Sequence, residues 1–198
     1  MPKQRLGRSV ILNRLVQYKG YESYLEIGCA ANATFSRIQT KTKIGVDPKR
    51  GGTHHQTSDE FFQDNRAHFD LVFIDGLHLA DQVLRDVENS LMWLLPGGTI
   101  ALHDCLPKRR IHQLRDRRTV AWNGDVWKAI VDLRQRADID VAVGQDAGMG
   151  YVLPRSNTEI LDPPPEVTWK YYKDHRNSLM RVMDWSKTEE FLGIGDDR

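Results

Sequence analysis

The sequence has few cysteines, no long apolar run and almost no net charge, and each shortage excludes a class of protein. Its two cysteines, Cys29 and Cys105, are too few for a disulfide framework and too far apart for a closely spaced zinc pair. No segment approaches the about 20 apolar residues of a membrane-spanning helix. The polar start MPKQRLGRS also lacks the apolar region of a secretory signal. We therefore expect a cytoplasmic protein without a membrane partner.

Net charge and chain length limit the kind of partner and the number of domains that we expect. Lysine and arginine total 28 against 27 acids, a formal net charge of +1, so no global field recruits nucleic acid. The 198 residues, 40% of them hydrophobic, suffice for one globular domain with a real core. A partner or substrate must therefore be recognised at a local site.

Strand-like and helix-like patterns alternate along most of the chain. The spacing of apolar residues predicts strands at 24–27, 43–47, 69–75, 99–103, 139–143 and 150–153, and helices at 5–19, 34–39, 80–94 and 125–136. This order predicts a doubly wound α/β sheet with helices on both faces. Residues 144–148 are too few for a helical crossover, so the last two strands should form an antiparallel hairpin.

The C-terminal part has a different composition. A run of three prolines, 163–165, precedes an aromatic and charged tail in which we expect a helix over 169–183. We expect residues 1–155 to form the main domain, and 156–198 a linker and helical tail packed on it. Packing on the sheet, capping a substrate pocket and pairing in a homodimer all remain open for this helix.

Acidic residues follow the predicted strands at the edge where ligands bind in open parallel sheets. Glu26, Asp47, Asp75 and Asp104 all lie at such strand ends. After the first strand, small residues such as Gly28 and Ala30 allow a sharp turn and a close approach to a ligand. A following helix would add free amide donors. A carboxylate at Asp47 would then suit the two hydroxyls of a ribose.

Four ordered motifs carry a family resemblance: Y-L-E-I-G-C-A, G-V-D-P, F-D-L-V-F-I-D-G-L-H and L-P-G-G-T-I-A-L-H-D. Over roughly residues 20 to 155 the chain resembles class I S-adenosylmethionine (SAM)-dependent methyltransferases, and within them the macrocin and novobiocin type of small-molecule and sugar O-methyltransferases. The resemblance implies a Rossmann-like, mostly parallel seven-stranded sheet with an antiparallel last strand. It departs from the family at Ala30 or Asn32, where a further glycine is usual.

The resemblance also implies roles for single residues. It assigns Glu26 and Gly28, with Ala30 in the same loop, to the methionine side of SAM, Asp47 to the ribose, Ser58 and Asp59 to adenine, and Asp75 to the place beside the methyl group.

The ends of two neighbouring strands should bring Asp75, His78, His103 and Asp104 to one pocket. In the related O-methyltransferases an acid at the Asp75 position and two acids at the next strand end hold a divalent ion. This chain would use Asp75, His103 and Asp104 for Mg²⁺ or, because an imidazole takes part, for another divalent metal. Without a metal, His103 or His78 could act as general base. Each histidine could also be structural, His103 at its strand end and His78 at a helix start.

Two further segments lie near this edge. The loop from Lys108 to Arg118 carries six basic residues, which would suit an anionic acceptor such as a phosphate or carboxylate, although a solvated face is the simpler interpretation. In the motif W-N-G-D-V-W we expect Asp125 to cap a helix and Trp122 to form a pocket wall.

The sequence thus favours a SAM-dependent methyltransferase for a small-molecule or sugar hydroxyl. An NAD-dependent oxidoreductase shares the fold and the ribose acid, but its first turn should be closer to G-x-G-x-x-G. A non-catalytic SAM-binding protein and a metal-dependent hydroxylase also remain open. Nucleic acid is a less favoured substrate, because no N-P-P-Y-type motif follows Asp75.

Overall fold

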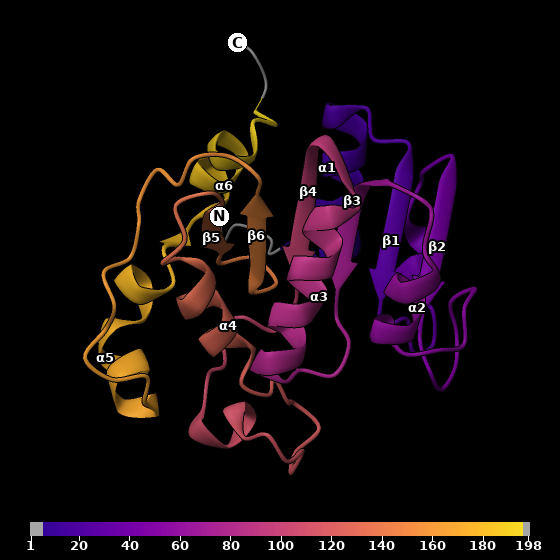
Figure 1. Ribbon diagram of the computed structural model, residues 1–198. Coiled ribbons are helices and arrows are strands. Elements are labelled where there is room, and N and C mark those ends of the chain that lie inside the picture. Colours follow the sequence, from indigo (N-terminus) through magenta and orange to yellow (C-terminus); the bar gives the residue numbers. More distant parts are fainter. Residues whose placement is uncertain (1–5, 196–198) are drawn as a thin grey trace.

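Strands and helices alternate along the first two thirds of the chain in the computed structural model, which describes residues 6–195 (Figure 1). The strands are β1 (Ser23–Ile27), β2 (Thr42–Val46), β3 (Phe69–Ile74), β4 (Leu94–Leu102), β5 (Asp140–Gly144), β6 (Met149–Leu153) and β7 (Val182–Met183). The α-helices are α1 (Arg8–Lys19), α2 (Ser58–Asp64), α3 (Ala80–Met92), α4 (Val126–Leu133), α5 (Trp169–Leu179) and α6 (Trp185–Leu192). Arg5, the first residue of the predicted N-terminal helix, lies outside the described residues.

The strands form one sheet in the order β2-β1-β3-β4-β6-β5-β7. β1 pairs in parallel with β2 and β3, and β3 pairs in parallel with β4. β6 runs antiparallel to both β4 and β5, so the predicted hairpin is confirmed. The chain goes outward from β1 to β2 and then returns to β3, which makes the gap between β1 and β3 the point where the strand order reverses. Ligands of such sheets bind outside the strands at this point.

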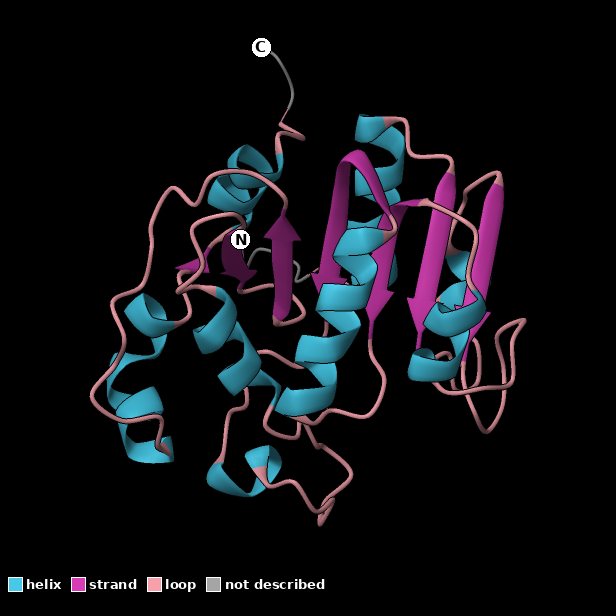
Figure 2. Cartoon of the chain, viewed as in Figure 1, coloured by secondary structure: helices cyan, strands magenta, loops and turns pink. Residues whose placement is uncertain are grey.

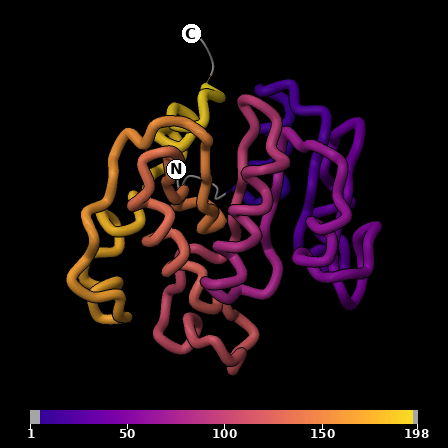
Figure 3. Tube along the Cα trace, in the orientation of Figure 1, coloured from indigo at the N-terminus to yellow at the C-terminus, as the bar shows by residue number. Residues whose placement is uncertain are grey.

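Helices cover both faces of the sheet, as the alternating order predicts (Figure 2). In β3, Val72 and Ile74 belong to one apolar cluster, together with residues of α2, α3, α4 and α5. Leu71 and Phe73 belong to the other, with residues of α1 and α6. Successive side chains of a strand point to opposite faces, and burial on both faces explains the continuous apolar run. The first half of the chain builds the β2 side of the sheet and the last third builds the β5 side (Figure 3).

The segment after β1 differs from the prediction. Instead of a helix over 34–39, the structure has a single 3-10 turn, Phe35–Arg37. Two preceding residues, Ala30 and Asn32, have left-handed backbone, with φ of 45° and 60°, and Lys43 Nζ donates to the carbonyls of Phe35 and Ile38. No α-helix therefore supplies amide donors at this end of β1.

Other helix and strand boundaries also differ from the prediction. Helix α2 was missed; it begins at a capping box in which Thr57 and Glu60 bond to each other's backbone amides. The predicted helix 169–183 ends at Leu179, because Arg181 adopts a left-handed φ of 46° and the next two residues join the sheet as β7. Residues 96–98 lie within β4, where the pairing with β3 shifts register, rather than in a separate turn. Among the described helices, none has the length and apolarity needed to cross a membrane.

Candidate active site at the carboxyl ends of the strands

The sheet ladder continues for one residue beyond β3 and β4 and so places two polar side chains next to each other. The amide of Asp75 donates to the carbonyl of Ile27 at 2.8 Å, and the amide of His103 donates to the carbonyl of Ile74 at 3.0 Å. Asp75 and His103 therefore leave the sheet side by side at the ends of β3 and β4, and Asp75 borders the gap between β1 and β3 where the strand order reverses.

Four side chains meet at this edge and form what we call the carboxylate-histidine cluster: Asp75, His78, His103 and Asp104. His103 Nδ1 lies 3.1 Å from Asp75 Oδ1 and 3.1 Å from Asp104 Oδ2. His78 Nε2 lies 3.3 Å from Asp75 Oδ1, and its Nδ1 lies 3.3 Å from Asp104 Oδ2. Two carboxylates thus alternate with two imidazoles, all of them largely buried.

The backbone around the cluster is strained at two of its members. His78 and Asp104 both have φ of 59°, a conformation that costs non-glycine residues free energy. Gly124 lies directly beneath His78, because a Cβ on it would come within 1.8 Å of the His78 carbonyl oxygen. The amide of Asp125 then donates to that same carbonyl at 3.2 Å. Backbone strain of this kind typically occurs at functional sites, where the surrounding structure fixes the direction of a side chain.

Two residues that the sequence did not single out complete the cluster. Arg8, at the start of α1, donates from Nη1 to Asp75 Oδ2 at 2.7 Å and lies 3.5 Å from His103 Nδ1. Asn123 donates from Nδ2 to Asp104 Oδ1 at 2.6 Å. Asn123 lies in the quoted W-N-G-D-V-W motif, which was a signal for it. Arg8 gave no such signal, because it is 67 residues away from Asp75 in the chain.

The contacts of the cluster favour the ionised form of Asp75 and the protonated forms of the two histidines. Burial alone would raise the pKa of Asp75, but hydrogen bonds with His103 and His78 and the charge of Arg8 lower it well below its usual range. Burial would likewise lower the pKa of His103, yet its bonds to Asp104 and Asp75 raise it to about 9. The pKa of His78 is also raised, because Asp75 and Asp104 outweigh burial.

The W-N-G-D-V-W motif lies against the cluster. The Trp122 ring stacks on the His78 ring, with centroids 5.0 Å apart and planes 20° apart, and its Nε1 donates to the carbonyl of Leu114. Asp125 occupies the N-cap position of α4 but does not cap that helix with its side chain. Its Oδ1 instead accepts from the amide of Ala80 at 2.9 Å, in the first turn of α3. The predicted cap therefore serves a different helix.

At the end of β1, Glu26 is buried and Gly28 lets the backbone pass close to β3. Glu26 is 2% exposed and accepts from the Tyr24 hydroxyl at 2.5 Å. Burial raises its pKa to about 7, against the lowering effect of the Tyr24 hydrogen bond. Gly28 has a φ of 89°, and a Cβ there would come within 2.3 Å of the Asp75 carbonyl oxygen. A side chain at Gly28 would therefore push Asp75 away.

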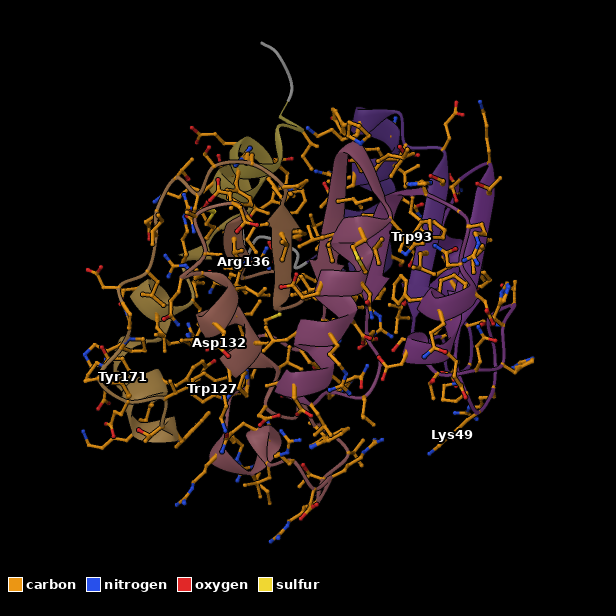
Figure 4. All side chains as sticks on the ribbon, in the orientation of Figure 1. Lys49, Trp93, Trp127, Asp132, Arg136 and Tyr171 are labelled. Atoms are coloured by element: carbon orange, nitrogen blue, oxygen red, sulfur yellow. The ribbon has the colours of Figure 1, made fainter. Side chains whose placement is uncertain are left out.

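Asp47 follows β2 and bonds to three backbone amides. Its Oδ2 accepts from Ala30 at 2.8 Å, and its Oδ1 accepts from Lys49 at 2.8 Å and Arg50 at 3.1 Å. These bonds lower the pKa of Asp47 although burial alone would raise it. A carboxylate offers about four acceptor positions, so one on Oδ2 remains for a ligand. The Lys49 side chain extends outward from this loop (Figure 4).

The predicted adenine residues lie at the start of α2. Ser58 is buried and turned toward α3: its hydroxyl donates to Asp86 Oδ1 at 2.6 Å and lies 3.2 Å from Gln82 Nε2. Asp59 Oδ1 accepts from Gln82 Nε2 at 3.2 Å and lies 3.6 Å from Arg85 Nε. The Ser58 hydroxyl is thus used within the protein, whereas Asp59 is half exposed.

Residues 12–105 match the sequence model of a family described as a methyltransferase domain, and this span contains all the strand-end acids. No curated protein matches the sequence. Helices α4, α5 and α6 lie outside the matched residues.

Solved structures share the fold of this chain at low sequence identity. The SAH-bound methyltransferase PaMTH1 of Podospora anserina is 17% identical, with 76% of this chain and 78% of that chain covered and a TM-score of 0.54. The O-methyltransferase TomG of Streptomyces achromogenes, in complex with SAM, is 15% identical, with 79% and 84% covered and a TM-score of 0.54. An O-methyltransferase of Bacillus cereus in complex with SAH is 14% identical, with 76% and 82% covered and a TM-score of 0.52.

The carboxylate-histidine cluster also contains donor atoms suited to a cation. Asp75, His78 and Asp104 each offer a ligand atom, and these atoms lie within 4.8 Å of one another. This set has His78 where the sequence predicted His103, although His103 Nδ1 contacts the same two carboxylates. His78 Nδ1 is buried and makes no hydrogen bond within residues 6–195, although it lies 3.3 Å from Asp104 Oδ2. The donor set fits a divalent ion.

The basic loop after β4 is only partly neutralised. Arg115 pairs with Asp81 at 2.7 Å and with Asp125 at 3.2 Å, so it ties the loop to α3 and α4. The other five basic residues have exposed side chains: Lys108, Arg109, Arg110, Arg117 and Arg118. Among them, Arg117 donates to the carbonyls of Thr119 and Val120.

Proposed function

We propose that this chain is an O-methyltransferase that uses SAM to methylate a hydroxyl group of a small molecule or sugar. The observation that carries the proposal is the carboxylate-histidine cluster at the ends of β3 and β4, whose Asp75 borders the reversal point of the strand order beside Gly28. The match to a methyltransferase domain supports the reaction class. The names of the O-methyltransferases that share the fold support oxygen as the acceptor atom.

The residues at the ends of β1 and β2 suit the parts of SAM that they would hold. The buried carboxyl group of Glu26 and the small loop residues Gly28 and Ala30 would face the methionine part. Asp47 would accept a ribose hydroxyl at its remaining acceptor position. Asp59 would contact adenine. Ser58 would do so only through its backbone, since its hydroxyl is bonded to Asp86.

Asp75 and Asp104, with His78 or His103, would hold a divalent ion, most simply Mg²⁺ or Mn²⁺. Arg8 occupies Asp75 Oδ2, so Oδ1 is the oxygen left for the ion. Neutral imidazole is the form that binds a metal, so the histidine that serves as ligand would have to lose its proton, which the raised pKa values of His78 and His103 oppose.

When bound, SAM supplies a methyl group on a positively charged sulfur, and a divalent ion lowers the pKa of an acceptor hydroxyl. In such a transfer the acceptor oxygen would bond to the methyl carbon as the carbon-sulfur bond breaks, and the hydroxyl proton would have to pass to a base. Where no ion is bound, His103 or His78 would take that proton only in its neutral form, which for His103 requires a pH near or above its raised pKa of about 9. Trp122, fixed on His78 and on the Leu114 carbonyl, would form a wall that orients the acceptor for in-line attack.

The basic loop favours an acceptor with an anionic group, which bidentate arginine contacts would recognise. A sugar or other small molecule with a phosphate or carboxylate meets both requirements. A cytoplasmic location and pairing into a homodimer stay predictions from the sequence.

Calorimetric titration of the purified chain with SAM and SAH tests the cofactor, with NAD as the control ligand and with either EDTA or Mg²⁺ present. Binding of SAM and SAH without NAD is the expected result; binding of NAD alone would point to an oxidoreductase. Asp104→Ala should abolish SAH formation in acceptor screens while SAH affinity stays near that of the wild type. Full activity of this variant would show that the cluster is only structural.

A further inference from the structure

A hollow of about 410 Å³ lies between α5 and the segment that follows Asp104. Its lining includes Pro107 and Lys108 on one side and Trp169, Lys173 and Arg176 of α5 on the other. The volume falls within the range of about 300–1,000 Å³ that small-molecule sites occupy. Nothing in the cluster or in the cofactor end of the site uses this hollow.

The hollow has an excess of positive charge. The side-chain amines of Lys108 and Lys173 form no hydrogen bond or ion pair with other residues of the described range 6–195. The Arg176 guanidinium donates only to its neighbour Asn177, at 3.3 and 3.4 Å. The acid in the lining, Asp174, is already paired with Lys170 at 3.2 Å. Three cations therefore face the hollow without a protein counter-charge.

The walls of the hollow are held together by buried aromatic contacts. The Tyr172 hydroxyl donates to the carbonyl of Pro107 at 3.1 Å and so joins α5 to the segment after β4. Its ring stacks with Trp169, with centroids 5.2 Å apart, and lies 4.8 Å from the ring of Trp127 in α4. Figure 4 shows Trp127 on α4 and Tyr171 on α5, the two helices that these contacts connect. These contacts fix the position of α5, which carries Lys173 and Arg176, relative to α4 and the segment after β4.

The hollow is also close to the carboxylate-histidine cluster. Lys108 is four residues beyond Asp104, and four residues span at most about 14 Å even when fully extended. A ligand of ordinary metabolite size could therefore place one end in the hollow and the other at the cluster.

We propose that this hollow binds the phosphate or diphosphate group of a ligand through Lys108, Lys173 and Arg176. Phosphate oxygens are strong acceptors for such cations, and the arginine can bind two of them at once. That the ligand is the methyl acceptor rests on the proposed function; that the hollow binds a phosphate group does not. The inferred substrate class is a phosphorylated small molecule, such as a sugar attached to a nucleoside diphosphate.

Calorimetric titration of the full chain with inorganic pyrophosphate and with uridine diphosphate tests the proposal. The variants Lys108→Ala, Lys173→Ala and Arg176→Ala should each bind about tenfold more weakly, as expected when one charge-assisted contact is lost. The matched control is Lys187→Ala, because Lys187 is an exposed lysine on α6 and does not line the hollow. Unfolding midpoints of all variants should equal that of the wild type, because these side chains are not in the core.

Three results would overturn the proposal: no binding of either probe, unchanged binding by the three hollow variants, or an equal loss in the Lys187 control. SAH is titrated into the same proteins in parallel. Failure of SAH binding with intact pyrophosphate binding would refute the methyltransferase proposal alone. The opposite pattern would refute the phosphate site alone.

Discussion

Asp86 in α3 provides a test in which the structure predicts both the sign and the size of a stability change. The carboxyl group is 1% exposed, and its Oδ1 accepts from Ser58 at 2.6 Å and from Gln82 at 3.0 Å. Burial is the largest influence and raises the pKa of Asp86 from 3.8 to about 6, although both hydrogen bonds act in the opposite direction. We predict that Asp86→Asn stabilises the protein at neutral pH.

The sign follows from proton binding. With a higher pKa in the folded state, Asp86 binds its proton more tightly there, so its contribution to stability is full below pH 3.8 and is lost as the pH rises through about 6. The rise in the pKa of Asp86 from 3.8 to about 6, at 1.36 kcal/mol per pKa unit, corresponds to roughly 3 kcal/mol of unfolding free energy. Asparagine keeps an acceptor oxygen for Ser58 and Gln82 without the buried charge. The variant should therefore gain up to roughly 3 kcal/mol over the wild type at pH 7 and little at pH 4.

Urea unfolding followed by tryptophan fluorescence, at pH values from 4 to 8, measures this difference. The quantity compared is the free energy of unfolding of the variant minus that of the wild type, which cancels other groups that titrate. Asp64→Asn, an exposed carboxylate at the end of α2, is the control and should show no pH-dependent difference. A difference for Asp86→Asn that is equal at pH 4 and pH 8 would refute the reasoning, because the buried carboxyl would then not be the titrating group.

Three further changes are predicted. Asp47→Ala should weaken SAH binding at least about tenfold in calorimetry, since it removes a charged acceptor; unchanged affinity would remove the ribose from this position. Gly28→Ala should lower the free energy of unfolding by roughly 2–4 kcal/mol, the combined cost of left-handed strain and overpacking against Asp75; wild-type stability would mean that the backbone there relaxes freely. Arg8→Ala should cost about 1–2 kcal/mol in urea unfolding because the partly buried Asp75 loses a charged donor but keeps two histidines, and Arg8→Lys should restore part of it; equal losses in both variants would show that the charge is irrelevant.

The strands were predictable because burial on both sheet faces requires a short, nearly continuous run of apolar residues in the sequence. The run Phe69–Ile74 is apolar on both sides, and the polar residue that ends it marks the carboxyl edge of the sheet. The hairpin of β5 and β6 followed from connection length alone, since a helical crossover needs more chain than residues 144–148 provide. The acids at the strand ends could be named on the same basis.

Helix boundaries were less predictable where local conformation overrides the apolar pattern. Thr34–Gln39 has helical spacing, but left-handed residues at Ala30 and Asn32 and the reach of Lys43 across to the same segment reduce it to one 3-10 turn. The short pairing of β7 with β5 similarly interrupted the predicted C-terminal helix, because a sheet edge competes for its backbone.

The sequence by itself determined the α/β order and the residues at the carboxyl ends of the strands, because both depend on the period of apolar residues along a short stretch of chain. Only the tertiary structure decided which groups those residues meet. Arg8 of α1 bonds to Asp75, which is 67 residues away in the sequence. The Asp125 side chain caps α3 instead of α4, and the Ser58 hydroxyl bonds to Asp86. Such contacts depend on how helices pack across the sheet, and residues far apart in sequence leave no local periodicity from which their contact can be predicted.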